Sequence, residues 1–188
     1  MKKMDEVNDI IEVPYIETQR LILRGLVEDD IGFLYQHFSK DEINEYSSFD
    51  NLTSLEEARD FYKKYIVPTT TRFRLGMVLK DTNELIGTLG FHRFSKKDSC
   101  LEVGGDLMRE YWGQGLMTEA LKSLIQYGFE HMGLNRIEAS TNSKNTRSIR
   151  LAERVGFKKE GVLRKKYFYN GEYHDDIVYS LLKEEWIK

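Results

Sequence analysis

One short segment places two glycines between the end of a strand pattern and the start of a helix pattern. It reads Met108-Arg109-Glu110-Tyr111-Trp112-Gly113-Gln114-Gly115, and a long stretch with helical spacing of apolar residues follows it. Because Gly113 and Gly115 lack side chains, backbone N–H groups there can point into one concavity, and the positive end of the helix dipole adds to them. The segment therefore predicts an anion site suited to a diphosphate. A tight turn is the plainer interpretation, since Gly-x-Gly alone is a weak signal.

Two other phosphate-binding loops do not fit this segment. No Gly-Lys-Ser/Thr sequence follows the glycines, which excludes a P-loop. The third glycine of a dinucleotide-binding fingerprint is missing, and the preceding strand patterns form a meander rather than a parallel unit. A diphosphate held by main-chain amides remains the chemistry that this loop favours.

Such a loop needs a sheet and helices to hold it in place. Alternating and continuous apolar runs predict strands over residues 16–24, 73–79, 85–94, 100–108, 136–141, from 157 onward, and over 173–182 after an Asn170-Gly171 turn. Helical spacing predicts helices over about 29–38, 53–67, 115–131 and 145–155. This order predicts an α/β fold of the α+β type, with a mixed, mostly antiparallel central sheet flanked by helices. We expect a loosely packed extension over residues 1–13 and a single domain over 14–188.

The composition narrows the range of partners. The 188 residues include 31% charged residues of both signs and carry a net charge of -3, so no broad basic field is expected to attract nucleic acid. No apolar run approaches the length of a membrane span, and residues 1–9 are charged where a signal segment would be apolar. A single cysteine, Cys100, excludes an intramolecular disulfide. We therefore expect a cytoplasmic protein without membrane or nucleic-acid partners.

Five segments, in order, resemble the GNAT superfamily of N-acetyltransferases. The loop over residues 112–120 is similar to the acetyl-CoA loop of that superfamily. The other four segments are residues 17–24, 86–90, 145–148 followed by 153–157, and 170–175. Together they resemble the branch that contains the ribosomal-protein N-terminal acetyltransferases. The resemblance implies direct transfer of an acetyl group from acetyl-CoA to a primary amine, on a fold whose strands splay apart at the cofactor site.

The resemblance also implies which residues hold acetyl-CoA. The backbone of Leu107 and Met108 would bond the pantetheine arm, and Asn145 would bond it from the opposite side. Asn145 is equally suited to cap a helix, and the two roles can coexist. The diphosphate would be held by the main-chain amides of Gly113, Gln114, Gly115, Leu116 and Met117. No metal is expected.

Acetyl transfer requires a base for the amine, a donor for the tetrahedral oxyanion and an acid for the departing thiolate. By resemblance, Glu102 is the expected base, acting through a water molecule. His92 on the preceding strand is the second candidate, because imidazole titrates near neutrality. The backbone N–H of Met108 is the expected oxyanion donor. A solvated glutamate and a histidine that only packs are the plainer interpretations of Glu102 and His92.

Two positions depart from the pattern of the family. Ala152 stands where many members carry a tyrosine, whereas Ser148 matches a serine that the ribosomal-protein branch carries three residues after the asparagine. The resemblance therefore implies Ser148 as the acid, with a helix first-turn serine as the alternative. Tyr167 stands where the ribosomal-protein branch can carry a catalytic glutamate, so it is expected to line the acceptor pocket instead. Cys100 has no basic neighbour in sequence and is expected to be a buried or half-buried strand residue.

Three kinds of function stay open at this point. The leading one is an acetyltransferase acting on a protein N-terminal amine, such as that of a ribosomal protein, with a polyamine or a small amine as the second acceptor. A CoA-binding module that has lost catalysis needs the same loop. A nucleotide-binding protein with a chance Gly-x-Gly is the third. A monomer and a homodimer fit the sequence equally.

Overall fold

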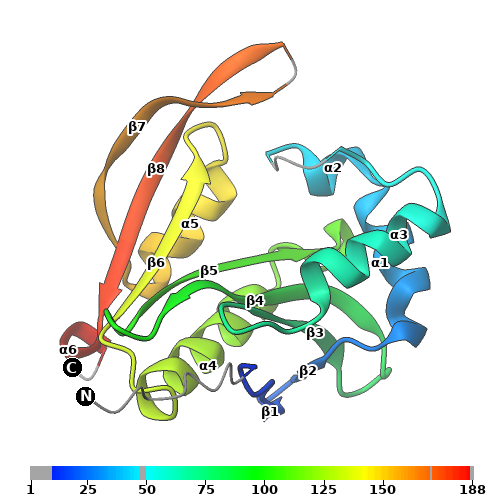
Figure 1. The fold of residues 1–188 in the computed structure, drawn as a ribbon, viewed down its shortest axis with the longest axis horizontal. Coiled ribbons are helices and arrows are strands. Elements are labelled where there is room, and N and C mark those ends of the chain that lie inside the picture. Colours follow the sequence, from blue (N-terminus) through cyan, green and yellow to red (C-terminus); the bar gives the residue numbers. More distant parts are fainter. Residues whose placement is uncertain (1–9, 47–49, 170, 187–188) are drawn as a thin grey trace, which may run out of the picture.

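The computed structural model describes residues 10–46, 50–169 and 171–186. An eight-stranded sheet in the order β1-β2-β3-β4-β5-β6-β8-β7 forms its centre (Figure 1). Every pair of neighbouring strands is antiparallel except β5 and β6, which are parallel. The predicted mixed, mostly antiparallel sheet flanked by helices is thus confirmed.

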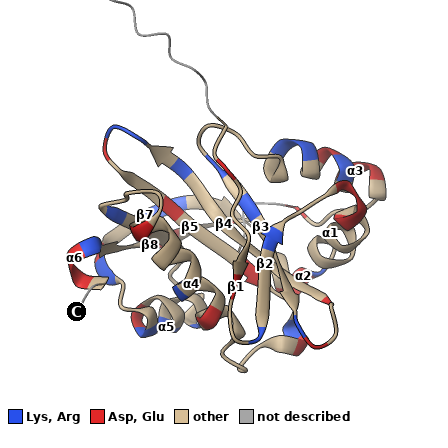
Figure 2. Cartoon of the chain, turned by 90° about the horizontal axis from the view of Figure 1, so that it is seen from below, with Lys and Arg blue, Asp and Glu red and all other residues tan. Residues whose placement is uncertain are grey.

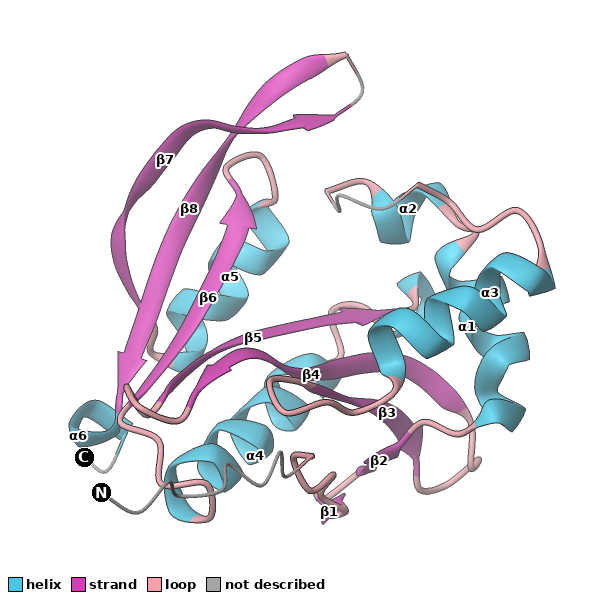
Figure 3. Ribbon diagram, in the orientation of Figure 1, coloured by secondary structure: helices cyan, strands magenta, loops and turns pink. Residues whose placement is uncertain are grey.

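The strands are β1 (Ile16–Glu17), β2 (Leu21–Gly25), β3 (Phe73–Leu79), β4 (Leu85–Ser95), β5 (Cys100–Leu107), β6 (Arg136–Asn142), β7 (Lys158–Tyr169) and β8 (Glu172–Leu182). The α-helices are α1 (Ile31–Phe38), α2 (Asp41–Asn44), α3 (Leu55–Phe61), α4 (Leu116–Glu130), α5 (Thr146–Val155) and α6 (Lys183–Trp186). Figure 3 shows α1, α2 and α3 gathered at one end of the molecule and the β7–β8 hairpin at another.

Some elements differ from the sequence-based expectation. The predicted strand over residues 16–24 is two strands, because Thr18 closes a turn: its amide donates to the carbonyl of Leu21, and its hydroxyl accepts from the amide of Leu21, both at 2.9 Å. The short helices α2 and α6 carry no apolar periodicity long enough to predict them. Asn170 of the predicted turn lies outside the described residues, while β7 and β8 pair as far as Tyr169 and Glu172.

The start of the described chain lies against the sheet domain. The amide of Ile11 donates to the carbonyl of Thr69 at 3.0 Å, and Ile11 and Val13 pack against the main core. Residues 1–9 of the predicted extension lie outside the described residues.

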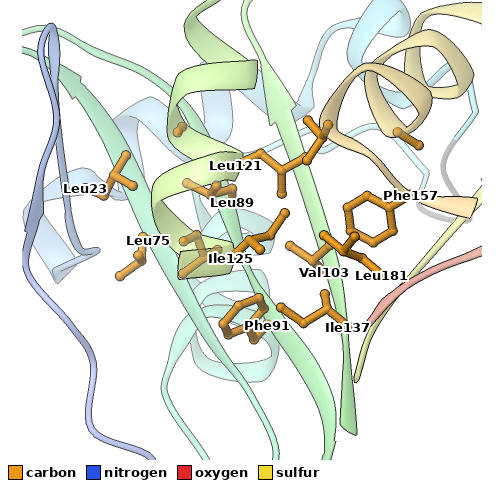
Figure 4. Close-up of a cluster of buried hydrophobic side chains, with 14 of the residues drawn as sticks. Leu23, Leu75, Leu89, Phe91, Val103, Leu121, Ile125, Ile137, Phe157 and Leu181 are labelled. Carbon is orange, nitrogen blue, oxygen red and sulfur yellow. The ribbon is translucent and has the colours of Figure 1, made fainter. Parts of the chain in front are cut away.

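Alternation along the strands gives the sheet one apolar and one polar face. The apolar face packs against α4 and α5, and Figure 4 shows Leu89, Phe91 and Val103 of the sheet beside Leu121 and Ile125 of α4. The opposite face carries polar side chains, among them the paired residues Thr88 and Asp106 and the paired residues His92 and Glu102. The main core therefore anchors the strands from one side, while α1 covers part of the other side through the contact of His37 with Asp106 and the rest of that side is left for chemistry.

Charge is spread over the outside of the molecule. Figure 2 shows basic and acidic residues together on α3 and on α6. Within the described ranges, no helix is both long and apolar enough to cross a lipid bilayer.

Candidate active site

The strands β5 and β6 separate after three residues of pairing. Cys100, Leu101 and Glu102 pair with residues 136–138, and from there β5 stays with β4 while β6 stays with β8. Figure 1 shows the two strands starting side by side and then diverging. Side chains from both diverging strands line one cavity of about 1190 Å³. The splay expected from the family resemblance is therefore present.

The register of β5 decides which amides face this opening. The amide of Met108 donates to the carbonyl of Ile86 on β4 at 2.9 Å. In an antiparallel pair, hydrogen-bonding direction alternates at every residue, so the amides of Gly105 and Leu107 point away from β4 and into the splay. The expected oxyanion donor, the Met108 amide, is thus already engaged inside the sheet, and the Leu107 amide is the one that faces the opening.

The glycine loop has the geometry of an anion site. Gly113 and Gly115 both have φ of 77°, in the left-handed region that glycine adopts without steric cost. Gly115 is the N-cap residue of α4 and offers no side chain to its first turn, so the first amides of the helix are left for another partner. Apart from the two chain neighbours of Gly113, no heavy atom of the described residues lies within 4 Å of the position that a Cβ would take at Gly113, so the loop is open on that side.

An ion pair that the sequence analysis did not identify fixes this loop to the rest of the sheet. Nη1 of Arg20 donates to the carbonyl of Gln114 at 3.0 Å, and Nε of Arg20 lies 2.7 Å from Oε2 of Glu119 in the first turn of α4. The hydroxyl of Thr18 donates to Oε1 of the same glutamate at 2.6 Å. In the sequence, only the resemblance of residues 17–24 to the family indicated that this region belongs to the site.

The start of α5 faces the cavity from the other side of the splay. Oδ1 of Asn145 accepts from the amide of Ser148 at 3.1 Å, which is the capping role open to Asn145 in the sequence. Ser148 is half-buried and lines the cavity, as does Ala152 one turn later. The guanidinium of Arg147 lies 4.1 Å from the ring centre of Trp112, which joins α5 to the glycine loop.

Glu102 lies where β5 leaves β6, surrounded by partners. Its Oε1 accepts from the hydroxyl of Ser140 at 2.8 Å, and its Oε2 lies 2.5 Å from Nη1 of Arg93. Nε2 of His92 lies 3.5 Å from Oε1. Burial alone would raise the pKa of Glu102, but hydrogen bonding to His92 and Ser140 and the charges of His92 and Arg93 outweigh it and hold the pKa at about 2. The carboxylate is therefore ionised at neutral pH.

The remaining candidates lie along the same side of the sheet. Tyr167 of β7 lines the cavity, and burial, with the charge of Asp176 next, raises the pKa of its phenol. Asp176 of β8 also lines the cavity, and no sequence pattern indicated it. Cys100 is half-buried as expected, and burial followed by the charge of Glu138 raises the pKa of its thiol. A thiol of this kind is a poor nucleophile at neutral pH.

A second polar network ties α1 to the end of β5. Nε2 of His37, a fully buried side chain, lies 2.5 Å from Oδ1 of Asp106, and the hydroxyl of Thr88 lies 3.0 Å from both carboxylate oxygens. Arg74 forms an ion pair with the same carboxylate. Burial by itself would raise the pKa of Asp106, but the charges of Arg74 and His37 and the hydrogen bonds of His37 and Thr88 hold it at about 2. The network thus positions the strand end that leads into the glycine loop.

The cavity is large and extends over two parts of the site. Its volume of about 1190 Å³ exceeds the roughly 300–1,000 Å³ of ordinary small-molecule pockets. One part lies at the glycine loop and the start of α5, and another lies over the polar sheet face. Among the side chains that the structure describes, no group of three or more His, Cys, Asp or Glu residues is arranged to hold a metal ion.

Helix α4 begins directly after two glycines, beside the point where the parallel strands β5 and β6 separate. This arrangement is typical of GNAT-fold acetyltransferases and indicates that class of protein. The family described as "Acetyltransferase (GNAT) domain" matches residues 20–158. The chain is 37% identical over 172 residues to "Uncharacterized N-acetyltransferase YoaA" of Bacillus subtilis, covering 90% of this chain and 97% of the relative. It matches a GNAT-family acetyltransferase structure from Bacillus anthracis with a TM-score of 0.82 and 27% identity, over 92% of this chain and 100% of that one. The chain therefore belongs to the GNAT acetyltransferase family.

Proposed function

We propose that this protein transfers the acetyl group of acetyl-CoA to a primary amine in one direct step, within a single domain over residues 14–188. The observation that carries the proposal is the continuity of the cavity. It runs from the glycine loop, through the splay of β5 and β6, to the carboxylate of Glu102 on the polar face. A thioester held in the splay would present its carbonyl carbon to an amine arriving from the polar face.

The proposed cofactor site uses main-chain groups on one side and α5 on the other. The backbone at Leu107 and Met108 accompanies the pantetheine arm, and Asn145 and Ser148 face it from α5. The loop amides hold the diphosphate, at Gly113, Gln114, Gly115, Leu116 and Met117. For the oxyanion we propose the amide of Leu107 in place of that of Met108, because only the former faces the splay.

The proton steps follow from the charges of the site. With a pKa of about 2, Glu102 is a weak base on its own but remains ionised beside an incoming ammonium group. We propose that it draws the proton of the amine through a bridging water molecule, with His92 beside it as the second candidate. Ser148, on the first turn of α5, is the proposed proton donor to the departing thiolate.

For the acceptor we propose a protein N-terminal amine, such as that of a ribosomal protein. The supporting relative is named "Putative ribosomal N-acetyltransferase YdaF" and comes from Bacillus subtilis; it is 33% identical over 68% of this chain and 72% of its own length. A polyamine is the second candidate, because a relative named spermidine N(1)-acetyltransferase from Escherichia coli is 24% identical over 88% of this chain. An anionic group at the acceptor side suits either cation.

The test is an acceptor panel assayed by CoA release. Short peptides with free N-termini, the same peptides with acetylated N-termini, and spermidine would each be incubated with protein and acetyl-CoA. CoA release with free peptides alone is the expected result, and mass spectrometry should place the acetyl group on the α-amine. Tight acetyl-CoA binding without CoA release for any amine would instead establish a CoA-binding module.

A further inference from the structure

We propose that Asp176 is a second anionic residue of the acceptor site, and that Asp176 and Glu102 together bind the ammonium group of the acceptor. The inference rests on the proposed function and extends it to the binding of the acceptor. It concerns a residue of β8 that no motif in the sequence singles out.

The strand register brings the two carboxylates to one place. Asp176 pairs with Asn142, and Val178 pairs with Ser140, so Asp176 and Ser140 lie on the same face of the sheet as diagonal neighbours. The hydroxyl of Ser140 donates to Oε1 of Glu102 at 2.8 Å. Ser140 therefore lies between the carboxylate of β5 and the carboxylate of β8.

Asp176 is buried but lacks a matching positive charge. Its exposed fraction is 3%, and its side chain lines the cavity. The strongest charge acting on it is the like charge of Glu102, while Lys166 and Arg93 act more weakly. Among the residues that the structure describes, no lysine, arginine or histidine forms an ion pair with Asp176, and Arg93 is bound to Glu102.

A buried carboxylate without a cation is unfavourable, and a ligand can remove that cost. Burial and the charge of Glu102 raise the pKa of Asp176, although hydrogen bonding to Ser140 and the more weakly acting charges of Lys166 and Arg93 lower it in part. An ammonium group brings one positive charge and three N–H donors, enough to reach both carboxylates with one donor to spare. The pair is therefore arranged to receive a primary ammonium ion at the polar end of the cavity.

The neighbouring residue Asp175 shows how a structural carboxylate is bound in this hairpin. Its Oδ1 accepts from the amide of Lys165 at 2.8 Å, where β7 and β8 change register. Strand alternation places it on the face of β8 opposite to Asp176. Because an asparagine oxygen can accept the same hydrogen bond, Asp175→Asn is a matched control for Asp176→Asn.

The experiment measures coupling between Asp176 and the charge of the ligand. A short peptide with a free N-terminus, and the same peptide with an acetylated N-terminus, would be titrated calorimetrically into the protein–CoA complex. The wild-type protein should prefer the free peptide by about ten- to a hundredfold, as expected for a hydrogen-bonded charge. Asp176→Asn should lose most of that preference, whereas Asp175→Asn should keep it. Spermidine should likewise bind more weakly to Asp176→Asn.

Acetyl-CoA affinity serves as the folding control and should be the same in all variants. If Asp176→Asn fails this control, Asp176→Ser takes its place in the same titration. The inference would be overturned if the wild-type protein bound the two peptides equally and did not bind spermidine. It would also be overturned if the Asp176 variant kept the full preference for the free peptide over the acetylated one. Binding that depends on Asp176 without any acetylation would instead refute the proposed function and leave this inference standing. Spermidine binding that depends on Asp176, without a peptide preference, would refute only the peptide acceptor.

Discussion

Two substitutions of Gly113 distinguish the effect of an added negative charge on acetyl-CoA binding from the effect of an added side chain. Aspartate and asparagine have almost the same size, and both tolerate the left-handed φ of 77° at this position better than other side chains do. In the part of the chain that the structure describes, the Cβ of either residue would meet no heavy atom within 4 Å beyond its own chain neighbours. A carboxylate roughly 6 Å from one negative charge of the diphosphate costs about 3 kcal/mol at an effective dielectric constant of about 20. This energy corresponds to a loss of affinity on the order of a hundredfold.

The assay is calorimetric titration of each variant with acetyl-CoA. Gly113→Asn should bind within about tenfold of the wild-type protein, because it adds backbone strain of roughly 1 kcal/mol and no charge. Gly113→Asp should bind on the order of a hundredfold more weakly than Gly113→Asn, and the difference should shrink as salt screens the charges. Equal affinities of the two variants at low salt would refute a diphosphate at this loop.

Three further predictions concern proton handling and stability. Glu102→Gln should lower kcat roughly a hundredfold and leave the affinity for acetyl-CoA unchanged. The factor should be similar at every pH near neutrality, because the pKa of about 2 keeps Glu102 ionised there. An unchanged kcat would remove Glu102 from the mechanism. Ser148→Ala should lower kcat by less than the roughly hundredfold expected for Glu102→Gln, and full activity would restrict Ser148 to the helix start. The pKa of Asp106, about 2 against an ordinary 3.8, stabilises the fold by roughly 2 kcal/mol above pH 3.8, and this contribution is lost as the pH falls toward 2. Asp106→Asn should lack that part of the acid dependence in urea unfolding, and an identical pH dependence in both proteins would contradict it.

Local patterns predicted the elements well where burial is strong. The apolar runs of β3 and β4 and the helical spacing of α4 indicated their boundaries to within about two residues. The split between β1 and β2 was missed because it depends on a side-chain hydrogen bond of Thr18 rather than on apolar periodicity. Short helices such as α2 leave too few residues for a period to be recognised.

Pairing between distant strands explains what the sequence could not predict at the site. The glycine loop and Asn145 are recognisable because their residue types and spacing are local. Asp176 reaches the cavity only through the register of β8 on β6, and the Met108 amide is engaged only because of the register of β5 on β4. Neither register can be read from one strand alone.

The two faces of the sheet have different roles at the site. The apolar face, packed on α4 and α5, holds the strand ends and the glycine loop in place. The polar face carries Glu102 and Asp176 and is proposed to receive the amine. Cofactor and acceptor would thus meet in the splay, and direct transfer requires such proximity of the two reacting groups.

We propose that acetyl-CoA lies in the splay, with its diphosphate on the glycine loop. Titration of ¹⁵N-labelled protein with acetyl-CoA, followed through the amide resonances, tests it most directly. We expect saturable shifts of the amides from Gly113 to Met117, together with that of Leu107, at one common Kd. Saturable binding that leaves these amides unshifted, or no binding at all, would contradict this placement of acetyl-CoA.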